Sequence, residues 1–350
     1  MKKHPITKTV QVLVKDLTPR NRDILSRRFG LKTGRKETLE SIGKSYGITR
    51  ERVRQIEEST LGQLAKTTQG NQELAKYINL ASDIIKRSGG VVKEKDLFND
   101  FSGNAEDNVI NASLAFVLRL NNDLARAAES DDFHAFWALN KEHAESFQGT
   151  VASLVRLMEK QKSVLLEKDF YNFVQKGEVP GIAGQPLNER QVGLCLNVSK
   201  NLDKNIFNEI GLATWPDIKP GGVKDKAYLV LKKEKSPKHF SEIAKLINTA
   251  GFNGRKANVQ TVHNELIKDG RFVLIGRGIY ALSEWGYRPG TVRDVLVDIL
   301  KRSSKPLQKS AILTKVMDAR LVKENTILLN LQDSKTFVKN KDGSYTLREV

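Results

Sequence analysis

The stretch that decides the fold of the N-terminal part runs from Glu37 to Glu57 and reads ETLESIGKSYGITRERVRQIE. Leu39, Ile42 and Tyr46 recur at the spacing of one helical face, which predicts a short helix. Gly47 follows this helix and can adopt a left-handed turn without steric cost. The stretch therefore predicts two short helices joined by a tight turn.

The second helix has different faces. Thr49 is a suitable N-cap, and the predicted inner face contains Val53, Ile56 and Thr60. The outer face carries Arg50, Glu51, Arg54, Gln55 and Glu58. In a major groove, guanidinium groups can bond to guanine and glutamine to adenine. The same residues would also suit a solvated helix surface with charge pairs one turn apart.

The residues from Leu17 to Leu64 resemble region 4 of the sigma-70 family of transcription initiation factors. The resemblance rests on Arg20–Leu31, Glu37–Lys44 and Thr49–Glu57. It implies a module that reads the −35 promoter element and binds the RNA polymerase flap. It assigns base reading to Arg50, Glu51, Arg54 and Gln55, and contacts with the DNA backbone to Arg28, Arg52 and Thr49.

Two departures from this family limit the resemblance. The family usually continues with a basic tail, whereas this chain has Ser59-Thr60-Leu61-Gly62-Gln63-Leu64. Only 16 residues precede Leu17, so we expect the regions that melt the −10 element to be absent. A complete sigma factor is therefore not expected.

The length and composition of the chain are sufficient for folded domains with hydrophobic cores. The chain has 350 residues, of which 39% are hydrophobic, so two or three domains are expected. Its single cysteine, Cys195, excludes a disulfide framework and a cysteine-based zinc site, and we expect its side chain to be buried. Because no apolar run is long enough for a signal peptide or a membrane span, a cytoplasmic, nucleoid-associated bacterial protein is predicted, with no membrane partner.

The net charge of +17 is unevenly distributed. Residues 1–66 hold 16 Lys/Arg against 7 Asp/Glu, while residues 91–150 hold 5 against 11. Residues 151–220 are nearly balanced, at 9 against 8. Residues 221–290 hold 13 against 6, and residues 291–350 hold 12 against 7. Both ends therefore suit an anionic partner such as DNA, and the middle does not.

A repeat follows the N-terminal module. Its equivalent starts are Val91, Val164, Lys238 and Leu307, separated by 73, 74 and 69 residues. Each repeat is predicted to close on a short hairpin, at Phe133–Leu139, Ile206–Trp215, Arg271–Leu282 and Phe337–Leu347. Three helices and a hairpin are the plan of a winged helix. The alternative is one larger mixed domain with coincidental spacing.

These patterns predict a mainly α protein with an N-terminal helix-turn-helix followed by winged-helix units in tandem. The expected divisions are a helix-turn-helix (1–66), a helical linker (67–90), an acidic unit (91–150), a second unit (151–221), a third (222–288) and a fourth (289–350).

The third unit resembles a HARE-HTH domain, a winged-helix module found in the bacterial RNA polymerase delta subunit. The resemblance rests on His239–Ile243 and Gly270–Gly286. The family's usual start of the second helix is replaced by Asn258–Asn264, so its base-reading residues are not transferred. On chemistry alone, the candidates for DNA contact are Lys256, Gln260, Asn264 and Arg277. Their alternative role is ordinary polar surface.

Patterns of catalysis and metal binding are weak. No metal-spaced pair occurs among the five histidines, His4, His134, His143, His239 and His263. Gly251–Lys256 imitates a KH loop but is interpreted as an inter-helix turn. Pro216-Asp217 could begin a nuclease site, but the acids that follow, Asp225, Glu234 and Glu242, all lack a lysine two positions on. No Walker-type loop is present. We expect no enzyme activity, no cofactor and no metal.

The leading hypothesis is a sequence-specific double-stranded-DNA-binding transcription factor that acts with RNA polymerase. One alternative is a polymerase-binding accessory protein with mainly protein contacts. Another is the DNA-specificity subunit of a restriction or repair system. The sequence indicates neither the target site nor an oligomeric state.

Overall fold

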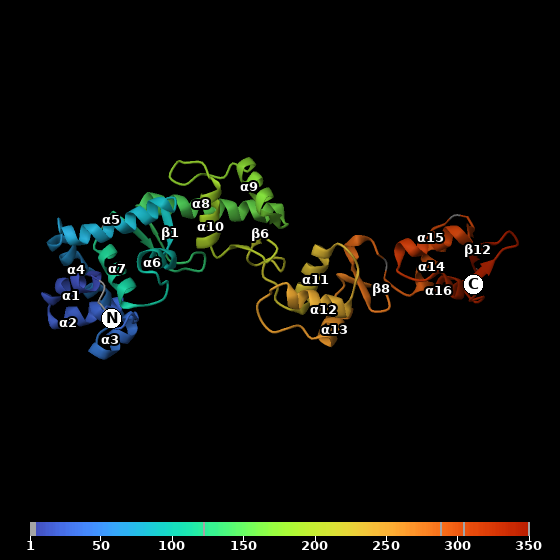
Figure 1. Cartoon of the computed structure of the whole chain (residues 1–350), viewed down its shortest axis with the longest axis horizontal. Helices are drawn as coiled ribbons and strands as arrows, with labels where there is room; N and C mark the ends of the chain where they lie inside the picture. The colour runs from blue at the N-terminus through green and yellow to red at the C-terminus, as the bar shows by residue number, and fades with distance from the viewer. Residues whose placement is uncertain (1–4, 122, 288, 304, 349–350) are drawn as a thin grey trace. The chain divides into compact units, whose positions relative to one another are not determined.

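The computed structural model describes residues 5–121, 123–287, 289–303 and 305–348 (Figure 1). These residues form sixteen α-helices and four three-stranded antiparallel sheets. The predicted mainly α fold class is therefore confirmed. The chain divides into two bodies: the N-terminal body is Met1–Lys204 with Asn208–Thr214, and the C-terminal body is Asn205–Phe207 with Trp215–Val350.

The N-terminal body begins with the predicted helix-turn-helix module. Its helices are α1 (Pro5–Lys15), α2 (Pro19–Phe29), α3 (Leu39–Tyr46) and α4 (Arg50–Thr67). Helix α2 starts at a proline behind the N-cap Thr18 and ends at Gly30, which has a φ of 75°. Proline at the first turn and glycine just past the end are the residues that favour these boundaries.

Two repeated units complete the N-terminal body. The first consists of α5 (Gln72–Arg87), β1 (Val91–Lys93), α6 (Glu94–Ser102), α7 (Val109–Arg119), β2 (Ala125–Ala127) and β3 (Phe136–Ala138). The second consists of α8 (Lys141–Gln161), β4 (Leu165–Leu166), α9 (Glu167–Lys176), α10 (Glu189–Val198), β5 (Leu202–Lys204) and β6 (Glu209–Leu212).

The C-terminal body holds the third and fourth units. The third consists of α11 (Val223–Glu234), β7 (Lys238–His239), α12 (Phe240–Thr249), α13 (Val259–Lys268), β8 (Phe272–Gly276) and β9 (Ile279–Leu282), followed by the 3-10 helix η1 (Ser283–Trp285). The fourth consists of α14 (Val292–Arg302), β10 (Leu307–Gln308), α15 (Lys309–Ala319), α16 (Glu324–Leu331), β11 (Phe337–Lys339) and β12 (Ser344–Leu347).

All four units have one topology. Each runs helix, strand, helix, helix, strand, strand, and the last strand lies between the other two, as in β1-β3-β2 and β7-β9-β8. Every pairing is antiparallel, for example Val92 with Trp137. The strands β1, β4, β7 and β10 begin at or next to the four predicted repeat starts. The spacing in the sequence therefore reflects a structural repeat.

Two hairpins begin earlier than predicted. The first starts at Ala125 rather than Phe133, and the second at Leu202 rather than Ile206. Ile206 instead lies in the turn between β5 and β6, where its side chain is exposed. Both early strands are only three residues long and contain charged residues, so the alternation that identifies a strand was too short to be recognised.

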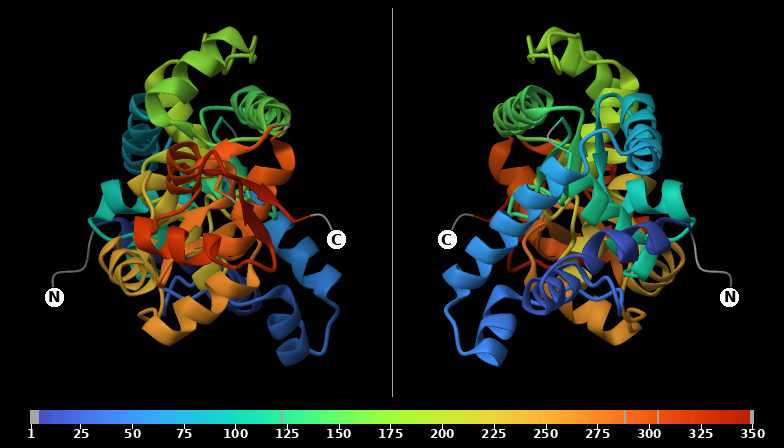
Figure 2. Two further views of the ribbon diagram at one scale, coloured as in Figure 1. Left: turned by 90° about the vertical axis from the view of Figure 1, so that its right-hand side faces the viewer. Right: turned by 90° about the vertical axis from the view of Figure 1, so that its left-hand side faces the viewer.

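The helix-turn-helix module and the first repeated unit share one hydrophobic core. Helix α1 packs against α7, and both can be followed in Figures 1 and 2. The rings of Phe29 and Phe116 meet edge to face, with centroids 5.2 Å apart. The predicted boundaries at 66 and 90 therefore cross a continuous core, into which Leu74, Ile84 and Ile85 of α5 also pack.

A buried carboxylate connects the same two parts. Glu94 at the start of α6 is only 8% exposed and accepts hydrogen bonds from Arg126 Nη2 and Trp137 Nε1, each at 3.0 Å. Lys36, from the loop before α3, lies 3.4 Å from Glu94 Oε1. Burial alone would raise the pKa of Glu94, but Arg126, Lys36 and Trp137 together hold it below its usual value. The charge is therefore retained inside the fold.

Candidate nucleic-acid interface

The helix-turn-helix has a small core of its own. Ile24, Ile42 and Val53 are fully buried, one from each of α2, α3 and α4. The partly buried side chains packed against them are Leu39, Tyr46, Ile48 and Ile56. Thr60 is also buried. The inner faces predicted for both helices are therefore confirmed, and the opposite face of α4 is left to solvent.

The turn between α3 and α4 depends on two glycines. Gly47 has a φ of 63°, the left-handed conformation expected from the sequence. Gly43 was not identified as important, yet a Cβ at this position would lie 2.7 Å from the carbonyl oxygen of Ile48. Its signal in the sequence is a glycine inside the last turn of a short amphipathic helix, where a close backbone approach is expected.

Both helices of the motif are capped by threonine. Thr38 Oγ1 accepts a hydrogen bond from the backbone N–H of Ser41, and Thr49 Oγ1 accepts one from that of Arg52, each at 3.1 Å. Such caps satisfy backbone donors that the first helical turn leaves unpaired. The hydroxyl of Thr49 is thus engaged with its own helix, and its predicted contact with the DNA backbone stays a prediction.

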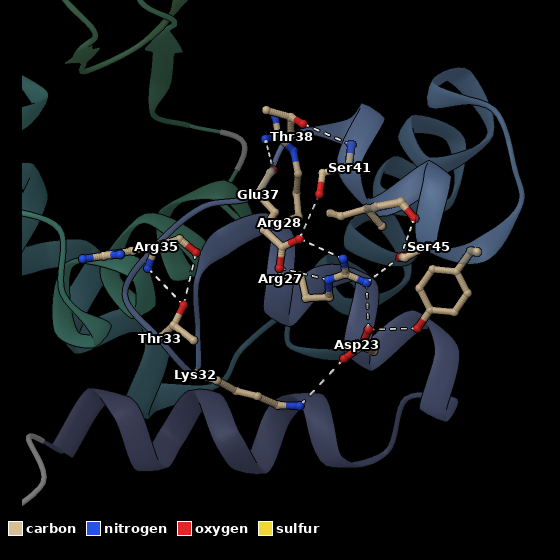
Figure 3. Close-up of polar contacts among 12 residues, drawn as sticks. Asp23, Arg27, Arg28, Lys32, Thr33, Arg35, Glu37, Thr38, Ser41 and Ser45 are labelled. Atoms are coloured by element: carbon tan, nitrogen blue, oxygen red, sulfur yellow. Dashed lines mark hydrogen bonds and ion pairs between the residues drawn. The ribbon is translucent and has the colours of Figure 1, made fainter.

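A polar frame holds α3 against α2 (Figure 3). Arg27 bonds to both carboxylate oxygens of Glu37, at 3.0 and 2.8 Å, and to Ser45 Oγ at 2.7 Å. Tyr46 donates to Asp23 at 2.9 Å. The hydrogen bond from Arg27 holds the pKa of Glu37 below its usual range. These contacts fix the position of α3, and through the tight turn that of α4.

Arg28 belongs to the same frame. Its Nε lies 3.0 Å from Glu57 Oε2 on α4, and its Nη1 donates to the carbonyl of Glu37 at 3.1 Å. The structure therefore gives this side chain an internal role. The contact with the DNA backbone that the resemblance implied stays a prediction for Arg28.

The outer face of α4 presents the predicted base-reading residues together. Arg50, Glu51, Arg54 and Gln55 are all exposed. Within the described parts of the chain, the Arg50 side chain forms no hydrogen bond or ion pair, although its charge helps to lower the pKa of Glu51. It is therefore the cation most directly available to a ligand.

The other polar residues of this face bond to one another. Arg54 lies between Glu51, 2.6 Å away, and Glu58. The hydrogen bond from Arg54 lowers the pKa of Glu51, and both carboxylates raise that of Arg54. Arg52 Nη1 donates to Gln55 Oε1 at 3.1 Å. A ligand that engages Arg54 or Gln55 must exchange these contacts for its own.

The second predicted surface lies on the third repeated unit. Lys256, Gln260, Asn264 and Arg277 are all exposed. Gln260 and Asn264 lie one turn apart on α13, and Gln260 Nε2 donates to Asn264 Oδ1 at 3.2 Å. Lys256 comes shortly before this helix, and Arg277 occupies the turn between β8 and β9.

The structure also bears on the predictions for the histidines, Cys195, the Gly251–Lys256 turn and membrane spans. Within the described ranges, no cluster of three His, Cys, Asp or Glu side chains is placed to hold a metal ion, and His4 lies outside these ranges. Cys195 is buried as predicted, and burial raises the pKa of its thiol to about 12. Gly251–Lys256 lies between α12 and α13, as the turn interpretation predicts. Among the described helices, none has the length and apolar character needed to cross a membrane.

Comparison with known proteins defines the class of the N-terminal module. Residues 13–66 match the family model of Sigma-70, region 4, so this segment is a sigma-70 region 4 domain. The chain is 41% identical over 76 residues to the RNA polymerase sigma factor SigA of Nostoc sp.. It is 42% identical over 67 residues to SigA of Clostridium acetobutylicum. These matches cover 22% and 19% of the chain. The chain spans about a fifth of the length of these curated relatives, at 19% and 18%.

Proposed function

We propose that this protein is a sequence-specific transcription factor that binds double-stranded DNA through α4 and acts with RNA polymerase. The observation that carries the proposal is the outer face of α4. A helix anchored by Val53 exposes Arg50, Arg54 and Gln55, side-chain types that bond to guanine and adenine edges. Its place of action is the bacterial nucleoid, and its role is binding rather than catalysis.

The similarity to sigma factors supports this proposal for the N-terminal module, residues 13–66. Region 4 similarity is associated with DNA binding and with transcription by RNA polymerase. We infer that the proposed target is related to a −35 element, and that the chain recruits, blocks or modulates polymerase.

We infer further that the four repeated units are winged helices and that the third is related to HARE-HTH domains. Their shared topology supports this inference, because each has three helices and a sheet whose last two strands form a hairpin. The charge distribution agrees with it, since residues 221–290 hold 13 Lys/Arg against 6 Asp/Glu. A basic surface supplies salt-sensitive affinity for phosphate.

A second candidate function is a polymerase accessory protein with mainly protein contacts. The observation that favours it is the union of α1 and α7 in one core. This union attaches a segment with 11 Asp/Glu and 5 Lys/Arg, residues 91–150, directly to the region 4 domain. Such a segment does not suit DNA but does suit a protein partner.

Fluorescence anisotropy of the full chain on two duplexes, one with a −35-like hexamer and one with its scramble, tests the leading proposal. We expect a preference of roughly tenfold for the hexamer, lost in the double variant Arg50→Ala/Arg54→Ala. Lys66→Ala, exposed in the last turn of the same helix, is the control and should keep the preference. Equal binding to both duplexes, with polymerase still bound by the double variant, would favour the accessory protein instead.

A further inference from the structure

The four repeated units use their third helices in different ways. These helices are α7, α10, α13 and α16, and each lies directly before the hairpin of its unit. Equivalent positions in one topology would have equal opportunity to contact a ligand. Their contacts within the chain decide which of them is available.

The third helix of the first unit, α7, is buried by packing within the N-terminal body. Every residue of α7 from Asn111 to Leu118 is buried. The helix packs against α1 and α2 of the region 4 domain as well as α5. It therefore serves as the support for the helix-turn-helix, and its surface is closed to DNA.

The third helix of the second unit is also engaged. Helix α10 packs against β1 of the first unit. Arg190 Nη1 donates to the carbonyl of Arg87 at 3.0 Å, and Asn197 Nδ2 lies 2.5 Å from Asp96 Oδ2. These contacts join the two units of the N-terminal body and occupy part of the surface of α10.

The third helix of the fourth unit is short, and the segment before it is anchored. Helix α16 has only eight residues and begins with the acidic Glu324. Arg320, 6% exposed, donates from Nη2 to the carbonyl of Leu274 in β8 at 2.6 Å. The approach to α16 is thus held against the third unit.

Helix α13 is different, because its packing leaves one face open. Val262 and Leu266 are buried against α11 and α12, and the His263 ring stacks on Phe240 with centroids 4.4 Å apart. The exposed residues of α13 include no acid and are Val259, Gln260, Thr261, Asn264, Ile267 and Lys268. Glu265, the one acidic residue of α13, is only partly exposed. A helix with a packed inner side and no fully exposed carboxylate suits a polyanionic ligand.

We propose that α13, with the β8–β9 turn, is a second DNA-binding surface that reads A·T base pairs in the major groove. The side chains that would meet base edges are amides and methyl groups rather than guanidinium groups. The hydrogen bond from Gln260 Nε2 to Asn264 Oδ1 leaves Gln260 Oε1 as an acceptor and Asn264 Nδ2 as a donor. Adenine presents the matching donor N6 and acceptor N7 in this groove.

The flanking residues provide the remaining contacts. The exposed methyl groups of Val259 are the kind of surface that packs against the thymine methyl. Lys256, just before α13, and Arg277, in the β8–β9 turn, are exposed cations of the kind that bind phosphates. The turn before α13 is held in place by Lys226, whose Nζ donates to the carbonyl of Asn253 at 2.9 Å. This inference rests on the proposed function only in taking duplex DNA as the ligand.

The test uses the full chain and duplexes that share one central hexamer but differ in their flanks. The flanks contain A·T, G·C or inosine·cytosine pairs. We expect flanks of A·T to be bound roughly tenfold more tightly than flanks of G·C. Inosine·cytosine presents the guanine pattern in the major groove but lacks the minor-groove amino group, so it should be bound as weakly as G·C. Equal affinity for inosine·cytosine and A·T would overturn a major-groove site.

Variants assign the preference to α13. Gln260→Ala/Asn264→Ala should lose the preference for A·T flanks, while Asn325→Ala/Thr326→Ala, exposed on α16, should retain it. Lys256→Ala/Arg277→Ala should reduce affinity for all flanks and lower the salt slope by about two. An unchanged flank preference in the α13 variant, with its melting temperature unaltered, would overturn the proposal. In Arg50→Ala/Arg54→Ala protein the flank preference should persist without the hexamer preference, which separates failure of this proposal from failure of the proposed function.

Discussion

The guanidinium of Arg28 on α2 bonds to the carboxylate of Glu57 on α4, with Nε and Oε2 3.0 Å apart. Three helices meet at this contact, because the same guanidinium also donates to the carbonyl of Glu37 just before α3. The outer surface of α4 is therefore positioned by an ion pair on its inner side.

Replacing Arg28 should destabilise the domain. Glu57 is largely buried, and Arg28→Ala would leave its carboxylate without a charged partner. We therefore expect the free energy of unfolding to fall by about 1–3 kcal/mol. Urea denaturation measures this loss. Arg50→Ala, which removes an exposed arginine of the same domain, should change stability by less than about 0.5 kcal/mol. Unchanged stability of Arg28→Ala, together with a smaller salt slope of DNA binding, would instead assign Arg28 to phosphate.

Gly43 should not tolerate a side chain. Its Cβ would lie 2.7 Å from the carbonyl oxygen of Ile48, so Gly43→Ala should lower the free energy of unfolding by about 1–3 kcal/mol. Gly62→Ala is the matched control, because a Cβ there meets no atom within 4 Å and Gly62 lies inside α4. Alanine at this helical position should stabilise by about 0.5–1 kcal/mol. If both variants were equally stable, the close approach at the turn would be wrong.

Glu94 gives the protein a testable pH dependence. Glu94→Gln leaves Arg126 without its carboxylate, and we expect a loss of about 3 kcal/mol in unfolding free energy at pH 7. The pKa of Glu94 lies below its usual value of 4.5, so its contribution is full above that value and declines as pH falls through the folded-state pKa.

The difference between wild type and Glu94→Gln should therefore shrink below about pH 4. Denaturation at a series of pH values measures it, with Glu142→Gln, exposed on α8, as a control for the charge change. A difference that grew on acidification would contradict a lowered pKa.

The carboxylate of Glu58 should lower the affinity of α4 for DNA. Arg54 pairs with Glu51 and with Glu58, so Glu58→Gln removes one of its two ion pairs and one negative charge from the outer face of α4. We expect the affinity for duplex DNA to rise roughly threefold to tenfold at low salt and less at high salt. Glu73→Gln on α5 removes an equivalent carboxylate, paired with Lys76 at 2.8 Å, and should have little effect. If both variants gained the same affinity for DNA, the change in net charge alone would explain the result.

Much of the fold could be predicted because short-range patterns determine it. Leu39, Ile42 and Val53 mark the inner faces of α3 and α4, and all three pack in one cluster. The repeat was visible because each unit restarts with the same strand-to-helix junction, as at Val91 and Lys238. Each of these features depends on residues close in sequence, where helical and strand periodicities are reliable.

Long-range pairing was not predictable in the same way. The contacts from Arg28 to Glu57 and from Lys36 to Glu94 join residues that no local pattern relates. The burial of α7 did leave a signal, since Asn111 and Ser113 are the only polar residues of Val109–Leu118, and its apolar residues are not confined to one stripe. A helix of that kind is expected to be buried on all sides. The partner that covers it, α1, lies far from it in the sequence, near the start of the N-terminal body.

The packing of α1 on α7 also determines when the N-terminal body can mature on the ribosome. Ile6, Val10 and Val14 are translated first, but the helix that covers them, Val109–Arg119, is translated about 100 residues later. At roughly 5–20 residues per second, this apolar stripe waits on the order of 5–20 s for its cover. Proteolysis of ribosome-bound chains stalled before and after α7 would detect the transition, and equal resistance at both lengths would contradict it. During synthesis, the apolar stripe on α1 of the region 4 domain thus stays without this cover until the unit that follows it has emerged.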